Sequence, residues 1–487
     1  TLELLKIGSD QSLMSGITHS VWHGFNYSPP EAPFPGWVQY GSYYNENNNW
    51  WPYFKYLNNY KARLSTVFQH ADMYTDIAIL PANYDMWGEM GVQTDPFPEK
   101  LNIPYTSIIW ESINKTGGAA DYTTEIIIND STVKDGKLCY GPKKYSTLFL
   151  PEVTSINPET AAKLYEFVAS GGRIFCIEKY PEKSLGLTNY KEKDQQVRQW
   201  VEKMKSFADR FILVKKPADN KFLEWYNDLL TKYSLPHYLT IENPDRFMMQ
   251  MRYQSDDKSE IIFFGNAHKF DAHTSKISFS PEITKGRKTE IWNPETGDRS
   301  RIELTDNSIT LELGPAETRL FVFSKERADK KWTFLPASNT NAENLNSDWN
   351  VEFRHSRENW VKNLKMDTLK DIKDTEFVNF TGTAVYRKTI NFDGAGKTIL
   401  NLGQVFGVSE VFVYGQSCGV KWYGRRIYNL APFLKKGQNE LEVRVVTVMG
   451  NYMKTLTDNK TAQKFTNQKT KDQPIQSMGL IGPVTVY

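Results

Sequence analysis

The sequence has little cysteine, no long apolar run and no excess of one charge. Its 3 cysteines lie too far apart for a disulfide framework or a CxxC zinc site. No apolar run reaches the roughly 18 residues that a membrane-spanning helix needs. The 59 Lys and Arg nearly balance the 57 Asp and Glu, and a net charge of +2 gives no support for a nucleic-acid scaffold.

Aromatic residues are the unusual part of the composition. They make up 14% of the chain, with 13 Trp, 26 Tyr and 27 Phe. Aromatic faces stack on sugar rings as readily as they fill cores, so this composition favours carbohydrate binding without establishing it. A length of 487 residues allows about three domains of roughly 150 residues each.

The first 74 residues predict two helices separated by a strand and a long loop. Thr1–Gly16 has the pattern of an amphipathic helix without a clear N-cap, and Ile17–Phe25 that of a buried strand. Residues 26–51 form a long aromatic loop, and the apolar spacing of Trp51–Gln69 predicts the second helix. A helix that enters a buried strand is typical of the interior of an α/β fold. We therefore expect the chain to be a fragment, or a mature form cut inside a larger protein.

Residues 75–244 alternate strands with helices. A strand–helix–strand unit requires a parallel crossover, so this region predicts an open, Rossmann-like α/β domain. Asn157 is expected to cap the central helix, and Gly171-Gly172 to end it. The predicted elements are strands at 76–80, 146–150 and 173–177 and helices from 157 to about 170 and from 222 to 233.

The rest of the chain predicts β-structure. From residue 245 the apolar period becomes alternating, so residues 245–325 predict a small antiparallel β-domain. A charged linker at 325–331 follows. Residues 332–487 carry about eight short strands separated by turn signals, which is typical of a jelly-roll β-sandwich.

Two histidines mark a candidate site near the start of the chain. On a strand, His19 and His23 lie on the same face, and polar groups at the end of a buried strand occur where barrel active sites lie. The alternative is a packed strand whose histidines are satisfied by hydrogen bonds.

A metal site in this region has weak support. A spacing of four residues suits shared ligation on a helix better than on a strand, and no HExxH occurs. Candidate oxygen ligands for calcium are present only by composition, at Asn45, Glu46, Asn47, Asn48 and Asn49. A solvated loop with a helix N-cap at Asn49 is the preferred interpretation.

Two further features have a structural alternative. Cys176 lies between the bulky Phe175 and Ile177, so a buried thiol is preferred over a nucleophile elbow. An aromatic-basic cluster provides either a sugar platform, a domain contact or core packing, with core packing preferred; it comprises Trp422, Tyr423, Arg425, Arg426 and Tyr428.

Three sets of motifs resemble one enzyme family. HGFNYSPPEAPFPGW followed by WWPYF resembles the end of the catalytic barrel in α-L-rhamnosidases of glycoside hydrolase family 106. IWNPETGDRSRIEL followed by LGPAETRLFVF is similar to the small β-domain of these enzymes. Four further motifs resemble the C-terminal sandwich of these enzymes: FTGTAVYRKTINF, LNLGQVFGVSEVFVYGQSCGVKWY, LKKGQNELEVRV and GLIGPVTVY.

The resemblance implies inverting hydrolysis of terminal α-L-rhamnosides from plant polysaccharide, with calcium at the active site. Two carboxylates about 6.5–9.5 Å apart perform such a reaction. Residues 1–74 have room only for the end of a TIM-type barrel. Most of the barrel and the catalytic carboxylates are therefore expected before Thr1, and the chain alone is expected to be inactive.

By the same resemblance, Trp22, His23 and Tyr27 would bind the sugar, with Glu31 orienting the loop or taking part in catalysis. It further implies an oligosaccharide or polysaccharide substrate, the missing barrel as partner, and a bacterial periplasmic or cell-surface location. Two alternatives remain. One is a non-catalytic carbohydrate-binding sandwich that uses Trp422 as an exposed aromatic. The other is a set of sandwiches that only brace the barrel.

Overall fold

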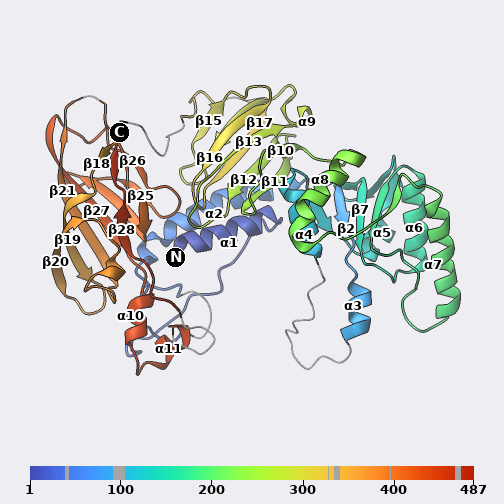
Figure 1. The fold of residues 1–487 in the computed structure, drawn as a ribbon, viewed down its shortest axis with the longest axis horizontal. Helices are drawn as coiled ribbons and strands as arrows, with labels where there is room; N and C mark the ends of the chain where they lie inside the picture. The colour runs from blue at the N-terminus through green and yellow to red at the C-terminus, as the bar shows by residue number, and fades with distance from the viewer. Residues whose placement is uncertain (39–42, 91–104, 327, 334–340, 395, 467–472) are drawn as a thin grey trace.

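The computed structural model describes residues 1–38, 43–90, 105–326, 328–333, 341–394, 396–466 and 473–487. A mixed α/β region lies at one end of the elongated molecule, and a β-sandwich lies at the other (Figure 1). Between them, a pair of helices near the N-terminus packs beneath a second β-region (Figure 1).

The helix pair consists of α1 (Leu2–Met14), the short helix η1 (Trp51–Tyr53) and α2 (Phe54–Gln69). Both predicted helices are thus confirmed. The side chain of Thr1 accepts a hydrogen bond from the Leu4 N–H, so α1 does have an N-cap. The buried stripe of α2 packs on the β-region; Phe68, for example, stacks on Tyr253 with ring centroids 4.3 Å apart.

The strand predicted over residues 17–25 is wrong. These residues are all described and form no regular strand; Phe25 makes only an isolated bridge to Tyr44. Side-chain bonds to α2 replace a strand partner, because Ser65 Oγ donates to the Thr18 carbonyl and Trp22 Nε1 donates to Asn58. The barrel end expected in residues 1–74 is therefore not seen as a strand. Instead, β1 (Ala71–Met73) pairs antiparallel with the second β-region.

The α/β domain contains a parallel sheet in the order β3-β2-β7-β8-β9, as predicted. Its strands are β2 (Ile77–Ile79), β3 (Ala120–Tyr122), β7 (Thr147–Pro151), β8 (Arg173–Ile177) and β9 (Phe211–Val214). A separate antiparallel meander comprises β4 (Thr132–Lys134), β5 (Lys137–Tyr140) and β6 (Lys143–Tyr145). The helices are α3 (Asn83–Met90), α4 (Thr106–Lys115), α5 (Glu125–Asp130), α6 (Pro158–Ala169), α7 (Tyr190–Lys205), η3 (Asp219–Lys221) and α8 (Phe222–Tyr233).

Alternate strand residues divide this domain into two cores. Leu148 packs with α6 and α7 on one face of the sheet, and its neighbour Phe149 packs with α4 and α8 on the other. Asn157 does lie at the N-cap of α6, but its side chain makes no capping bond. Instead, its backbone N–H donates to Glu125 Oε2 at 2.8 Å, so a carboxylate from α5 satisfies the helix end.

The small β-domain forms one sheet in the order β1-β11-β12-β17-β14-β15 and another in the order β10-β13-β16. The predicted boundary at 245 is wrong, because β10 (Leu239–Ile241) already pairs with β13 and buries Leu239 and Ile241 in the same core. The other elements are β11 (Met248–Ser255), β12 (Glu260–Asn266), β13 (His273–Phe279), α9 (Pro281–Thr284), β14 (Lys288–Trp292), β15 (Arg299–Ile302), β16 (Ser308–Leu313) and β17 (Thr318–Ser324).

The C-terminal region is a β-sandwich whose sheets have the orders β20-β19-β21-β27-β24-β25 and β18-β29-β22-β26. Both sheets contribute to one core, which includes Trp349, Tyr386 and Leu400. Its jelly-roll connectivity stays a prediction. The strands are β18 (Glu343–Asn344), β19 (Ser347–His355), β20 (Val361–Thr368), β21 (Gly382–Phe392), β22 (Ile399–Asn401), β23 (Gln404–Phe406), β24 (Val408–Val413), β25 (Gln416–Lys421), β26 (Ile427–Asn429), β27 (Gly437–Val446), β28 (Gly479–Gly482) and β29 (Thr485–Val486); the helices are η4 (Ile372–Asp374), α10 (Gly450–Thr455) and α11 (Lys460–Thr466).

Candidate functional site

The segment between α1 and η1 carries the predicted sugar-binding residues. Its described residues, 15–38 and 43–50, run as a coil from the helix pair toward α10 and α11 of the sandwich (Figure 1). Trp22 is held on α2: its Nε1 donates to Asn58 Oδ1 at 2.8 Å, and the Lys61 ammonium lies 3.7 Å from its ring centroid. The ring also tilts against Tyr44 and Phe54, so Trp22 is fixed and only partly exposed.

The other three predicted residues on this segment point to solvent. His23 and Glu31 are exposed, and Tyr27 is 67% exposed. Within the described residues, none of these three side chains makes a hydrogen bond or ion pair. Their polar groups are therefore available to a ligand or to another part of the protein.

The far end of the segment is fastened to the C-terminal sandwich. Asn49 Nδ2 donates to Thr381 Oγ1 at 2.7 Å and to the Thr447 carbonyl at 3.0 Å, and Asn49 Oδ1 accepts from Ser356 Oγ at 2.8 Å. The prediction of an N-cap at Asn49 is wrong, because Trp50 takes that position without a side-chain bond. The amide of Asn49 is used entirely to join two distant parts of the chain.

The stretch around Glu31 rests on α10 and α11. Asn459 Nδ2 donates to the Phe34 carbonyl at 2.7 Å, and the Arg357 guanidinium lies 4.8 Å from the Phe34 ring centroid. Tyr452 adds a ring contact to Phe34 at 6.0 Å. The sandwich therefore positions the segment that the sequence assigns to the sugar pocket.

The asparagines of this segment do not fit a calcium site in the described structure. Asn45 Nδ2 donates to the Asn26 carbonyl at 2.7 Å, and Asn45 Oδ1 accepts from the Asn47 N–H at 3.1 Å. His19 Nδ1 lies 3.3 Å from Gln69 Nε2 and so has a protein partner. Among the described residues, no group of three or more His, Cys, Asp or Glu side chains has metal-binding geometry.

Trp422 lies at a domain contact, so the expectation of an exposed aromatic there is wrong. It is 2% exposed, and its ring contacts Tyr60 of α2 at 6.0 Å and Tyr423 at 4.5 Å. It also lines a cavity of about 650 Å³ beside Thr1. The connection between β25 and β26 carries Trp422 into the core beneath the small β-domain, where little of its face remains for a sugar.

The neighbouring residues form an ionic junction between the sandwich and the small β-domain. Arg425 donates to both oxygens of Glu317 at 2.9 Å, and Arg319 binds the same carboxylate at 3.1 Å. Burial acts to raise the pKa of Glu317, but the two guanidinium groups outweigh it and lower this pKa to about 2.

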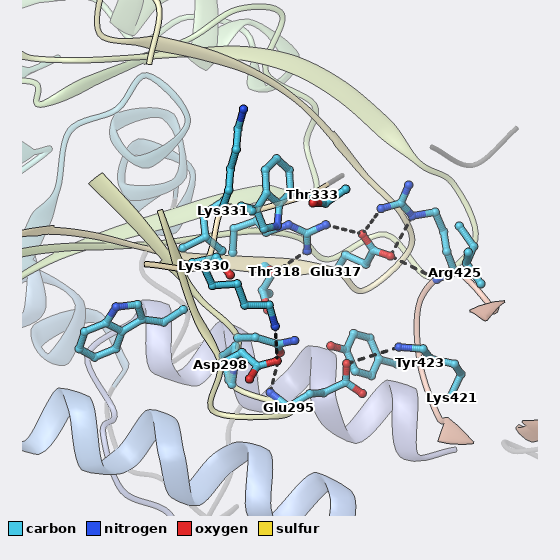
Figure 2. A pocket seen from close by; sticks show the side chains of 18 residues that line it. Glu295, Asp298, Glu317, Thr318, Lys330, Lys331, Thr333, Lys421, Tyr423 and Arg425 are labelled. Atoms are coloured by element: carbon cyan, nitrogen blue, oxygen red, sulfur yellow. Dashed lines mark hydrogen bonds and ion pairs between the residues drawn. The ribbon is translucent and has the colours of Figure 1, made fainter. Parts of the chain in front are cut away.

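A cavity of about 360 Å³ lies beside this junction. Figure 2 shows Lys330 reaching Asp298 and Lys421 facing Glu295 across it. The corresponding N–O distances are 3.3 Å and 3.9 Å. The carboxylates of this cavity are therefore paired with cations of the protein, which supports a bracing role.

Cys176 is a buried structural thiol, as preferred from the sequence. It lies on β8 inside the core, and burial raises its pKa, so the thiol stays protonated at neutral pH.

Among the described residues, no helix is long and apolar enough to cross a membrane.

Comparison with known proteins places this architecture among the glycoside hydrolases. A family model described as alpha-L-rhamnosidase, glycoside hydrolase family 106, matches residues 2–306. This is more than half of the chain, so the chain belongs to that family.

Two relatives extend the comparison. A putative β-glucuronidase from Formosa agariphila is 27% identical over 354 residues, which are 71% of this chain and 27% of that protein. A rhamnosidase from Novosphingobium sp. PP1Y shares the fold over 100% of this chain and 46% of its own length, with 19% identity and a TM-score of 0.65. The chain thus spans less than half the length of both relatives.

Sequence reasoning missed the residues that hold the candidate segment. Asn459 and Arg357 contact Phe34 across more than 300 positions of sequence, and no local motif marks either of them. The sequence predicts a capping role for Asn49, whereas its side chain bonds to Thr381 of the sandwich.

Proposed function

We propose that this chain is part of an enzyme that removes terminal α-L-rhamnosyl residues from plant polysaccharide. The observation that carries the proposal is the family match over residues 2–306. The exposed and unpartnered groups of His23, Tyr27 and Glu31 agree with it, because they lie on a segment that the rest of the fold holds in place.

The proposed reaction is a single inverting displacement. A general-acid carboxyl gives its proton to the glycosidic oxygen as the bond from that oxygen to the anomeric carbon breaks. A second carboxylate, about 6.5–9.5 Å away, takes a proton from the water that attacks the opposite face. Free rhamnose of inverted configuration and a polysaccharide hydroxyl are the products.

We assign roles in this reaction to four residues of the segment. The exposed face of Tyr27 and the free edge of Trp22 pack on the apolar C–H groups of the sugar. The His23 ring nitrogens bind a sugar hydroxyl, and Glu31 orients the segment or serves as one of the two carboxylates. The barrel that the family builds supplies the remaining catalytic groups.

Contact with that barrel would also explain an apolar strip on the same segment. Ile17, Val21, Phe25 and Trp37 are between 53% and 86% exposed, although they are large and hydrophobic. Exposed apolar side chains grouped on one segment are typical of an interface. We propose that the barrel domain of the same protein covers them.

Calcium follows from the family resemblance alone, and the location follows from the class of substrate. No catalytic step is assigned to calcium, since the described donors do not form its site. We expect export to the periplasm or cell surface because the proposed substrate is a polysaccharide.

The test compares the full-length protein with this chain on an aryl α-L-rhamnoside, with added calcium and with a chelator. We expect hydrolysis by the full-length protein, little or none by the chain alone, and proton NMR that shows the inverted anomer first. A full-length protein without glycosidase activity in every metal condition, or one that releases the retained anomer first, would refute the proposal.

A second role, bracing, is favoured by the contacts of the sandwich. Asn49 and Asn459 join the sandwich to the candidate segment, and Arg425 joins it to the small β-domain. Removal of the sandwich from the full-length enzyme is expected to lower its melting temperature and leave its order of preference among aryl glycosides unchanged. A changed order would show that the sandwich selects the substrate directly.

A further inference from the structure

A cavity of about 380 Å³ lies at the end of the C-terminal sandwich, where β19 passes into β20 beside α10. This volume falls in the range of pockets for small molecules. We propose that it binds an uncharged sugar residue of a glycan, an activity beyond the proposed hydrolysis. Its lining includes His355, Glu358, Trp360, Lys362, Glu376, Asn379 and Tyr452.

The floor of the cavity offers a hydrogen-bond donor without a protein partner. His355 Nδ1 accepts from the backbone N–H groups of Arg357 at 3.2 Å and Glu358 at 2.9 Å. The proton of the neutral ring is therefore on Nε2, which has no hydrogen-bond partner among the described residues. His355 is only 6% exposed and lines the cavity, so a ligand there would satisfy an otherwise unused donor.

This donor is present at neutral pH. Burial lowers the pKa of His355, and the nearby Arg357 lowers it further, while Glu358 acts in the opposite direction. The ring therefore stays neutral, with Nδ1 as acceptor and Nε2 as donor.

The aromatic walls pack around His355, and one of them is also held by a carboxylate. Glu358 Oε2 accepts a hydrogen bond from Trp360 Nε1 at 2.8 Å. Both rings also contact His355, with centroid distances of 4.8 Å for Trp360 and 5.0 Å for Tyr452. A site whose rings are ordered in advance loses little conformational entropy when a sugar binds.

The rim presents polar groups that the protein leaves unused. Glu376 and Asn379 are exposed and make no hydrogen bond or ion pair within the part of the chain that the structure describes. Lys362 only lies over the Trp360 ring, at 4.9 Å from its centroid. Amide and carboxylate oxygens at the edge of an aromatic pocket are suitable acceptors for sugar hydroxyls.

The charge of the lining selects among sugars. Two carboxylates, Glu358 and Glu376, face one ammonium, Lys362, beside a neutral imidazole. Arg357 adds a positive charge nearby, but it does not line the cavity and its guanidinium lies over Phe34 and donates to Asn47. The two carboxylates of the lining itself disfavour a uronate or a sulfated sugar, so we infer an uncharged sugar such as a rhamnosyl residue. Tyr452 also packs on Phe34, so a glycan in the cavity would contact the ring that supports the candidate segment.

Calorimetric titration of the 487-residue chain tests this inference without any need for hydrolysis. The probes are methyl α-L-rhamnoside, methyl β-D-glucoside and D-glucuronate. We expect saturable binding of at least one neutral glycoside with a Kd of about 1 mM, and at least about tenfold weaker binding of glucuronate. The rim variant Glu376→Gln keeps the fold and should weaken the neutral glycoside about threefold to tenfold.

Two further variants separate binding from folding. Trp360→Ala should abolish measurable binding, with a melting curve recorded to establish that the chain is folded. Glu440→Gln removes an exposed carboxylate of the same sandwich outside the cavity and should leave the Kd unchanged. A folded chain that binds none of the probes, or an affinity that Trp360→Ala and Glu376→Gln leave unchanged, would overturn the proposal.

Discussion

The cavity at the domain junction and the cavity at the end of the sandwich have similar volumes, about 360 and 380 Å³. They differ in how their polar groups are used. At the junction, Glu317 is shared by two arginines, and Lys330 and Lys421 face acidic partners. At the sandwich end, His355 Nε2 and Glu376 have no partner among the described residues.

The pairing of the polar groups distinguishes a contact that braces the fold from a site that can bind a ligand. A buried polar group costs free energy unless it is hydrogen-bonded, so satisfied groups stabilise the fold and leave nothing for a ligand. Groups that have no protein partner in a preformed aromatic cavity remain available to a ligand. Volume alone does not separate the two cases.

The largest loss of stability is expected when the ionic junction loses Arg425. Arg425→Ala leaves Glu317 buried with Arg319 alone, and we expect the free energy of unfolding to fall by about 3 kcal/mol. Denaturant titration measures this loss. The matched variant Lys330→Ala breaks an exposed pair with Asp298 and should change stability by less than about 0.5 kcal/mol. Equal effects of the two variants would contradict the assignment of a buried brace.

A buried carboxylate without a hydrogen-bond partner should make stability depend on pH in the opposite direction to Glu317. Asp76 Oδ1 is buried and makes no hydrogen bond among the described residues, and burial raises the pKa of Asp76 to about 7, against the lowering influence of Arg252. The unfolded chain releases this proton near pH 4, so the stability that Asp76 confers is largest below that pH. It falls as pH rises to about 7.

Asp76→Asn tests this sign. We expect the variant to be more stable than the original chain at pH 8, by an amount on the order of 2 kcal/mol, and nearly equal to it at pH 4. Thermal unfolding across this pH range provides the measurement. For Glu317, whose pKa is lowered to about 2, stability is instead complete above about pH 4.5 and lost as pH falls toward 2. If Asp76→Asn is less stable than the original chain at pH 8, the raised pKa assigned to Asp76 is contradicted.

The smallest expected effect concerns the fastening of the candidate segment. Asn49→Ala removes the hydrogen bonds to Thr381, Thr447 and Ser356, and we expect a loss of about 1 kcal/mol together with faster proteolysis between residues 26 and 50. Asn363→Ala on the exposed face of β20 is the control and should change neither quantity. Unchanged proteolysis in Asn49→Ala would show that the sandwich does not hold this segment.

Elements with a strong internal period were predictable from the sequence. The spacing in Trp51–Gln69 and the boundaries Arg173–Ile177 and Phe222–Tyr233 all agree with the structure. In these segments the apolar pattern, the flanking glycines and the helix starts act over a few residues. The chain therefore carries the information locally.

The errors occurred where a distant partner decides the local structure. Ile17–Phe25 has a strand-like sequence, but its groups bond to α2 and no neighbouring strand is present. Trp422 has the composition of a sugar platform, yet the fold buries it against Tyr60. Leu239–Ile241 is too short to show a strand pattern in the sequence, and it becomes a strand because it pairs with β13.

The family, the order of the α/β and β regions, and the helices whose apolar faces repeat every three to four residues are all predictable from the sequence. Which polar groups find a protein partner, and which have none, depends on the tertiary structure. Glu317 meets Arg425 across 108 positions, and Asn459 meets Phe34 across 425. The satisfaction of a polar group depends on the geometry of such partners, which no local spacing in the chain encodes.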